Sequence, residues 1–142
     1  MTTSRWVVIL ATVLVSGGVA WLLKLVAIAI LVATGAQDIE SAAVAFFYLT
    51  GLGLLFVGST ALGLRLTMNR PVPLRIAAMV LSPIMFWVSY QILDGIADGI
   101  VGSEAPGYVQ GETAFLLAVL VWTAIGAMLL KSTGQTPTTR VA

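Results

Sequence analysis

Four long apolar runs make up most of this chain and limit what it can fold into. They cover about residues 6–33, 41–64, 74–94 and 112–131. A membrane-spanning helix needs about 20 consecutive apolar residues, whereas the elements of a soluble core are shorter. Of the 142 residues, 59% are apolar and 9% are charged, against about 25% charged in an ordinary soluble domain. The sequence therefore predicts an integral membrane protein with a single transmembrane domain over residues 1–142.

The pattern within the runs favours helices over strands. Backbone polar groups in lipid must be satisfied inside the protein, which allows only α-helices and closed β-barrels. Barrel strands alternate apolar and polar residues over about ten positions, and these runs do not alternate. The first run, with Arg5 before it and small residues at 16–20, also has features of a signal peptide, but we expect it to be retained as a span. The expected fold is an all-α, four-helix transmembrane bundle with short loops.

The charged residues fall into two sets once the spans are placed. Basic residues lie near the chain ends and around the second loop; these are Arg5, Arg65, Arg70, Arg75, Lys131 and Arg140. Acidic residues lie in and beside the first and third loops; these are Asp38, Glu40, Asp94, Asp98, Glu104 and Glu112. Four spans put the two sets on opposite sides of the membrane. Because basic residues favour the cytoplasmic side, we expect both termini in the cytoplasm and the chain in a prokaryotic plasma membrane.

Lys24 is the charged residue that interrupts a predicted span. It lies 18 residues after Trp6, or about 27 Å along a helix. That depth is near the outer edge of a hydrocarbon core about 30 Å thick. The apolar run continues beyond Lys24, so the first helix must tilt or project outward. Lys24 is then either an interfacial lysine that reaches toward water or a paired charge.

Asp94 is the candidate partner for Lys24 because the two lie at similar depth. Asp94 comes 20 residues after Leu74, or about 30 Å along the third span. Asp94 and Asp98 are four residues apart, so they share a helix face and repel each other near a helix C-terminus. A cation would relieve this repulsion, either Lys24 or a metal ion. Ending the helix before Asp98 would also relieve it.

A small outward-facing polar pocket follows from this placement. Its candidate binding residues are Lys24, Tyr90, Gln91, Asp94 and Asp98. The competing interpretation is that Trp87 and Tyr90 are aromatic residues of the membrane interface. We expect Asp38 to cap the second helix.

Small residues at helical spacing predict where the spans approach each other. Gly, Ala, Ser and Thr let helix backbones come close in lipid. The candidate packing residues are Thr12, Ser16, Ala20, Gly51, Gly58, Ser59, Gly63, Ser82 and Ser89. Pro83 is expected to kink the third span.

Composition removes several classes of function. The chain has no Cys and no His, which excludes disulfides, thiolate metal sites and the commonest general base. The net charge is +1 without a basic tract, so nucleic acid is not an expected partner. We expect no enzymatic activity, no catalytic residue, no metal and no cofactor. The expected partners are the lipid bilayer and either other membrane protein chains or further copies of this chain.

Three functions fit these limits. The preferred one is a non-enzymatic accessory, assembly or scaffolding subunit of a larger membrane complex. The alternative is a small oligomeric transporter or channel with a polar pocket around Lys24 and Asp94. The first span has no carboxylate near its middle, which argues against proton-coupled export. The third is a membrane enzyme that acts on lipid through the acidic pair Asp94 and Asp98.

Overall fold

Four helices make up the described part of the chain. The computed structural model describes residues 3–36, 41–102, 104 and 107–134. These residues form α1 (Thr3–Ala33), α2 (Ala42–Leu66), α3 (Val72–Val101) and α4 (Gly107–Gly134), and they contain no strand. Each helix is long and apolar enough to cross a membrane. The all-α, four-helix prediction is confirmed for these residues. All four helices extend beyond the predicted spans at one end or both, and α3 and α4 extend furthest.

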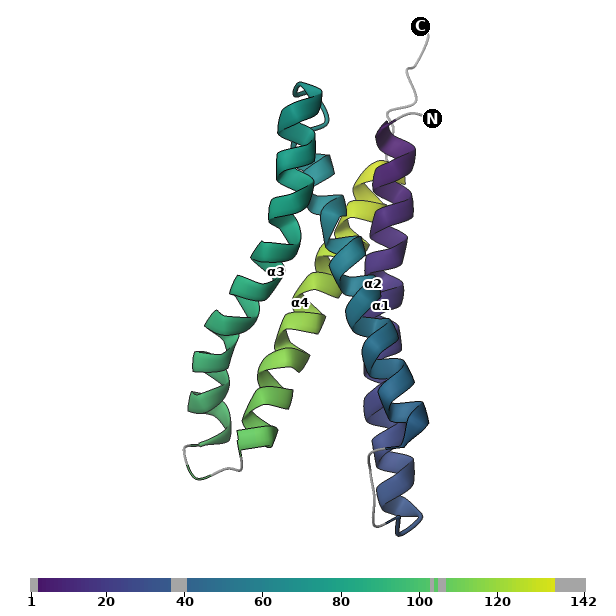
Figure 1. Cartoon of the computed structure of the whole chain (residues 1–142), viewed down its shortest axis with the longest axis vertical. Helices are drawn as coiled ribbons and strands as arrows, with labels where there is room; N and C mark the ends of the chain where they lie inside the picture. The colour runs from purple at the N-terminus through teal and green to yellow at the C-terminus, as the bar shows by residue number, and fades with distance from the viewer. Residues whose placement is uncertain (1–2, 37–40, 103, 105–106, 135–142) are drawn as a thin grey trace, which may run out of the picture.

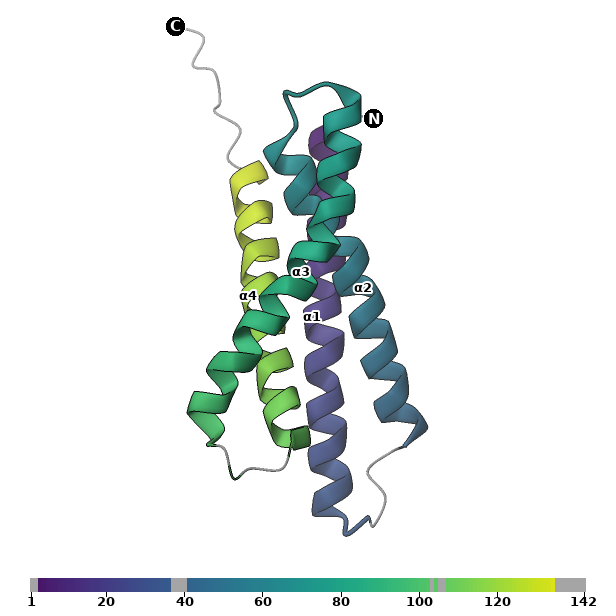
Figure 2. The ribbon, with the colours of Figure 1, turned by 60° about the vertical axis from the view of Figure 1, so that its left-hand side comes forward.

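The helices are arranged as two hairpins that pack against each other (Figure 1). α1 packs against α2 and α4, and α3 packs against the same two helices. Among the described residues α1 and α3 make no close contact, so they lie diagonally across the bundle. α1 begins and α4 ends at the same end of the bundle. At the other end α1 and α2 project beyond α3 and α4 (Figure 2), as the apolar run beyond Lys24 requires.

Local sequence signals explain how α2 and α3 begin. Ser41 caps α2, because its Oγ accepts a hydrogen bond of 3.2 Å from the backbone N–H of Val44. The cap is thus Ser41 rather than Asp38, which lies outside the described residues. α3 begins just after Pro71, whose missing N–H is no loss at a helix start. Pro83 lies inside α3, which continues through it and bends in its middle.

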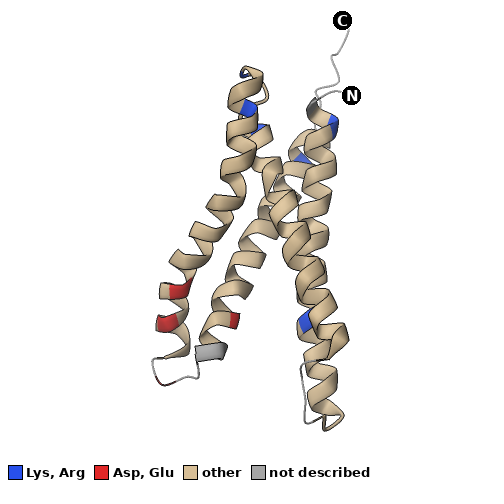
Figure 3. Ribbon diagram, in the orientation of Figure 1, with Lys and Arg blue, Asp and Glu red and all other residues tan. Residues whose placement is uncertain are grey.

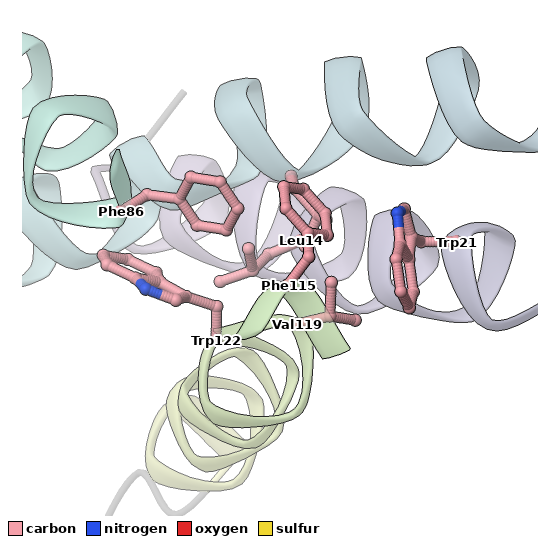
Figure 4. Close-up of a cluster of buried hydrophobic side chains, with 7 residues drawn as sticks. Leu14, Trp21, Phe86, Phe115, Val119 and Trp122 are labelled. Atoms are coloured by element: carbon pink, nitrogen blue, oxygen red, sulfur yellow. The ribbon is translucent and has the colours of Figure 1, made fainter. Parts of the chain in front are cut away.

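An aromatic core joins all four helices near the middle of the bundle (Figure 4). Its buried residues are Leu14, Trp21, Leu55, Phe86, Phe115, Val119 and Trp122. Phe86 meets Phe115 and Trp122 edge to face, with ring centroids 6.0 and 5.7 Å apart. The indole Nε1 of Trp122 donates a hydrogen bond of 2.9 Å to Ser89 Oγ, which ties α4 to α3. Large rings therefore fill the space between the helices at this level.

Glycines set the close approach between α1 and α2. A Cβ at Gly17 would lie 2.6 Å from the backbone N of Leu55, and a Cβ at Gly51 would lie 2.7 Å from the backbone N of Trp21. A Cβ at Gly58 would overlap the backbone of Leu14. The two helix backbones thus touch over several turns, which only residues without a side chain permit.

The predicted packing residues have different positions in the structure. Those on α2 and α3 are buried or half-buried; these are Gly51, Gly58, Ser59, Gly63, Ser82 and Ser89. On α1, Ala20 is half-buried, whereas Thr12 and Ser16 are exposed. The face of α1 that meets its neighbours contains Gly17 and Gly18 instead, with Gly18 against Thr123 of α4.

Candidate functional site

The buried cation Lys24 is paired with Glu112 of α4. The Lys24 Nζ lies 2.7 Å from Oε1 and 2.6 Å from Oε2 of Glu112. The same ammonium lies 4.5 Å from the ring centroid of Trp21 and 5.2 Å from that of Tyr48. These distances suit cation–π attraction, which strengthens when the cation is desolvated. One carboxylate and two aromatic rings therefore surround the ammonium.

The two partners of this ion pair differ in burial. The Lys24 side chain is 4% exposed, whereas the Glu112 side chain is 48% exposed. The carboxylate neutralises a charge that would otherwise be buried alone, which is costly in a medium of low polarity. The positive charge of the site is therefore buried, and its negative charge is partly exposed.

Three helices bring these side chains together from distant parts of the sequence. Lys24 follows Trp21 by one helical turn on the buried face of α1, Tyr48 lies in the second turn of α2, and Glu112 lies in the second turn of α4. Lys24 and Glu112 are separated by 88 residues in the chain. The site thus depends on how the two hairpins pack, not on any local motif.

A cleft of about 820 Å³ opens beside the ion pair between α1, α2 and α4. Its lining residues are Lys24, Leu25, Ile28, Ser41, Val44, Ala45, Tyr48, Val109, Glu112, Thr113 and Leu116. α1 runs toward the projecting end of the bundle, whereas α2 and α4 run away from it. Most of the lining residues come after Lys24 on α1 or before Glu112 and Tyr48 on the other two helices, so they lie between the ion pair and that end. The ion pair thus lies in the inner part of a largely apolar cleft, with Leu116 one helical turn deeper on α4.

The remaining predicted pocket residues lie on α3, which makes no close backbone contact with α1. Tyr90 is half-buried, with its ring centroid 5.6 Å from that of Phe115. Asp94 is half-buried, whereas Gln91 and Asp98 are exposed. α3 continues through Asp98 to Val101, so the helix does not end before the acidic pair. Tyr90 lies near enough to Tyr48 and Glu112 to interact electrostatically with both. The structure therefore places Tyr90 beside the ion pair, whereas Gln91, Asp94 and Asp98 make no salt bridge or hydrogen bond with the lysine.

Lys24 pairs with Glu112 and not with Asp94. Depth did not distinguish the two carboxylates, because both lie toward the same end of the bundle as the lysine. The order of the helices does distinguish them, since α4 lies next to α1 and α3 lies diagonally opposite. The sequence does contain an indication of this pairing, because Glu112 lies at the start of the fourth apolar run. It made Glu112 as good a candidate by depth as Asp94.

Apart from Lys24, the described basic and acidic residues lie toward opposite ends of the bundle (Figure 3). Basic residues near the end where α1 begins are Arg5, Arg65, Arg70, Arg75 and Lys131. Acidic residues toward the other end are Asp94, Asp98, Glu104 and Glu112. Asp38, Glu40 and Arg140 belong to the same prediction but lie outside the described residues. Within the described ranges, no group of three or more His, Cys, Asp and Glu residues is placed to hold a metal ion.

Comparison with known proteins does not assign the chain to a family. No family model matches it, and no curated protein or solved structure shows significant similarity. The function must therefore be inferred from the chemistry of the site and the surface.

Proposed function

We propose that this chain is a non-enzymatic accessory, assembly or scaffolding subunit of a complex in the cytoplasmic membrane. The observation that carries the proposal is the internal neutralisation of Lys24. Its ammonium is held by both oxygens of Glu112 and enclosed by Trp21 and Tyr48. A cation held in this way joins α1 to α4 and is enclosed within the bundle, with 4% of its side chain exposed.

The surface of α3 supports a role among other membrane components. Large apolar side chains remain exposed along the whole helix; they include Leu74, Val80, Ile84, Met85, Val88, Ile92, Ile96 and Ile100. Such a surface needs lipid or the helices of another chain around it. Either neighbour is consistent with a subunit that is embedded in a membrane.

A small oligomeric transporter or channel is the second candidate, and the cleft beside Glu112 is the observation that favours it. A pore through one copy of the chain conflicts with the aromatic core, because Phe86, Phe115 and Trp122 fill the middle of the bundle. A conducting path would have to form between copies. The subunit proposal needs no such path and is therefore preferred.

Purification from the native membrane tests the subunit proposal. The full chain carries an affinity tag and is cross-linked in the membrane before extraction in a mild detergent. We expect other membrane chains in a constant ratio to this one across independent preparations. An unrelated four-span protein with the same tag is the control. A homo-oligomer without other chains would overturn the proposal and favour the transporter.

Single introduced cysteines test the proposed orientation, in which both termini are cytoplasmic. The natural chain has no Cys, so each variant carries one label site. We expect a membrane-impermeant maleimide to label Glu104→Cys in intact cells. We expect Ser132→Cys, at the end of α4, to be labelled only after the membrane is opened. The reverse labelling pattern would contradict the orientation.

A further inference from the structure

We propose that the cleft beside the Lys24–Glu112 pair binds a hydrophobic organic cation. The positive group of the ligand lies against the Glu112 carboxylate, and its apolar body lies along the cleft wall. This binding site goes beyond the subunit role, and its test measures a different quantity from the test of that role.

The first argument is the sign of the charge that the cleft presents. Lys24 Nζ donates one hydrogen bond to each carboxylate oxygen of Glu112. Each of these oxygens has a second lone pair that can accept a hydrogen bond from, or contact, another cation. The carboxylate side chain is 48% exposed and lines the cleft, whereas the lysine side chain is 4% exposed. A ligand that enters the cleft therefore meets an available negative group and an enclosed positive one.

The second argument is the field at this end of the bundle. The described residues there carry the carboxylates of Asp94, Asp98, Glu104 and Glu112 against the single ammonium of Lys24 (Figure 3). A surface with an excess of one sign raises the local concentration of ions of the opposite sign. The acidic end therefore attracts cations to the mouth of the cleft.

The third argument is the size and wall of the cleft. Its volume of about 820 Å³ lies within the range of about 300–1,000 Å³ that small-molecule sites occupy. Leu25, Ile28 and Val44 supply an apolar wall between the projecting end of α1 and α2 and the charged pair, which lies in the inner part of the cleft. A phospholipid would place its charged headgroup at the membrane surface and its tails inward, which is the opposite polarity. The cleft therefore fits a compact cation with an apolar body.

Two probes of the same shape and opposite charge test this assignment. The full chain is purified in nanodiscs of zwitterionic lipid, and binding is measured by equilibrium dialysis and calorimetry, with empty nanodiscs as the blank. We expect tetraphenylphosphonium to bind saturably with one site per chain. We expect tetraphenylborate to show only the uptake of the empty nanodiscs. Saturable binding of the anion with equal or higher affinity would overturn the proposal.

Charge variants place the cation at Glu112. We expect Glu112→Gln to weaken tetraphenylphosphonium binding at least tenfold. The matched control is Asp98→Asn, which removes the same charge from an exposed position on α3 outside the cleft lining. It reports only the loss of one charge from the surrounding field, so we expect it to weaken binding by no more than about twofold. Equal affinity in Glu112→Gln and the natural chain would contradict the assignment.

Glu112→Gln also affects folding, so a second pair of variants is needed. The first of these variants changes the cleft, and both leave the ion pair intact. Ala45→Trp places a large ring in the cleft wall and should weaken binding at least tenfold. Ala43→Trp changes an exposed residue of the same helix that does not line the cleft, and it should bind as the natural chain does. Equal affinities in these two variants would overturn the site.

Discussion

Replacing Glu112 with Gln is expected to lower the free energy of unfolding by about 2–3 kcal/mol, because it leaves the Lys24 ammonium buried without a counter-charge. This loss of stability is smaller than for a fully buried ion pair, because the Glu112 side chain is 48% exposed and water reaches this position. Lys24→Met should cost less, about 1 kcal/mol, since the methionine stem still packs near Trp21 and Tyr48 and the exposed Glu112 can be hydrated. The asymmetry follows from exposed fractions of 4% for Lys24 and 48% for Glu112.

The measurement is reversible unfolding in mixed micelles, followed by circular dichroism and tryptophan fluorescence. Asp94→Asn is the control, because it removes a carboxylate from α3 at similar depth and should change stability by less than about 0.5 kcal/mol. A double-mutant cycle should give a coupling energy of at least about 1 kcal/mol for Lys24 with Glu112 and none for Lys24 with Asp94. The reverse result would restore Asp94 as the partner of the lysine.

Replacing Gly58 with Ala is expected to destabilise the bundle by about 2–3 kcal/mol, because overpacking forces backbones apart. The added Cβ would overlap the backbone N and Cα of Leu14, which cannot move aside as a flexible side chain can. α1 must then shift away from α2, which also loosens the nearby close approach of Gly51 to Trp21. One methyl group thus affects an interface that extends over several helical turns.

Gly53→Ala is the matched control on the same helix. A Cβ at Gly53 meets no atom within 4 Å, so the variant should be neutral or more stable by up to about 1 kcal/mol, since alanine favours a helix over glycine. The same unfolding measurement compares the two variants. If both change stability in the same direction by similar amounts, the close approach of α1 and α2 does not limit stability.

The sequence by itself determined the number, type and approximate bounds of the elements. Lipid offers no hydrogen bonds to the backbone, so an apolar run of sufficient length must satisfy its own polar groups as a helix. That requirement is local and can be read directly from runs such as 41–64 and 112–131. The separation of the described charges toward two ends follows from the same count of spans, because the charges lie beside the ends of the runs.

Only the tertiary structure decided which faces and which charges meet. A helix that is apolar on most sides shows no single buried face in its sequence, so the spacing of Thr12 and Ser16 did not distinguish the exposed side of α1 from the side with Gly17 and Gly18. Depth along a span likewise gave Lys24 two possible partners, Asp94 on the third span and Glu112 on the fourth. The pairing with Glu112 followed from α4 packing beside α1, and neighbour order depends on side-chain fit between distant segments rather than on any local pattern.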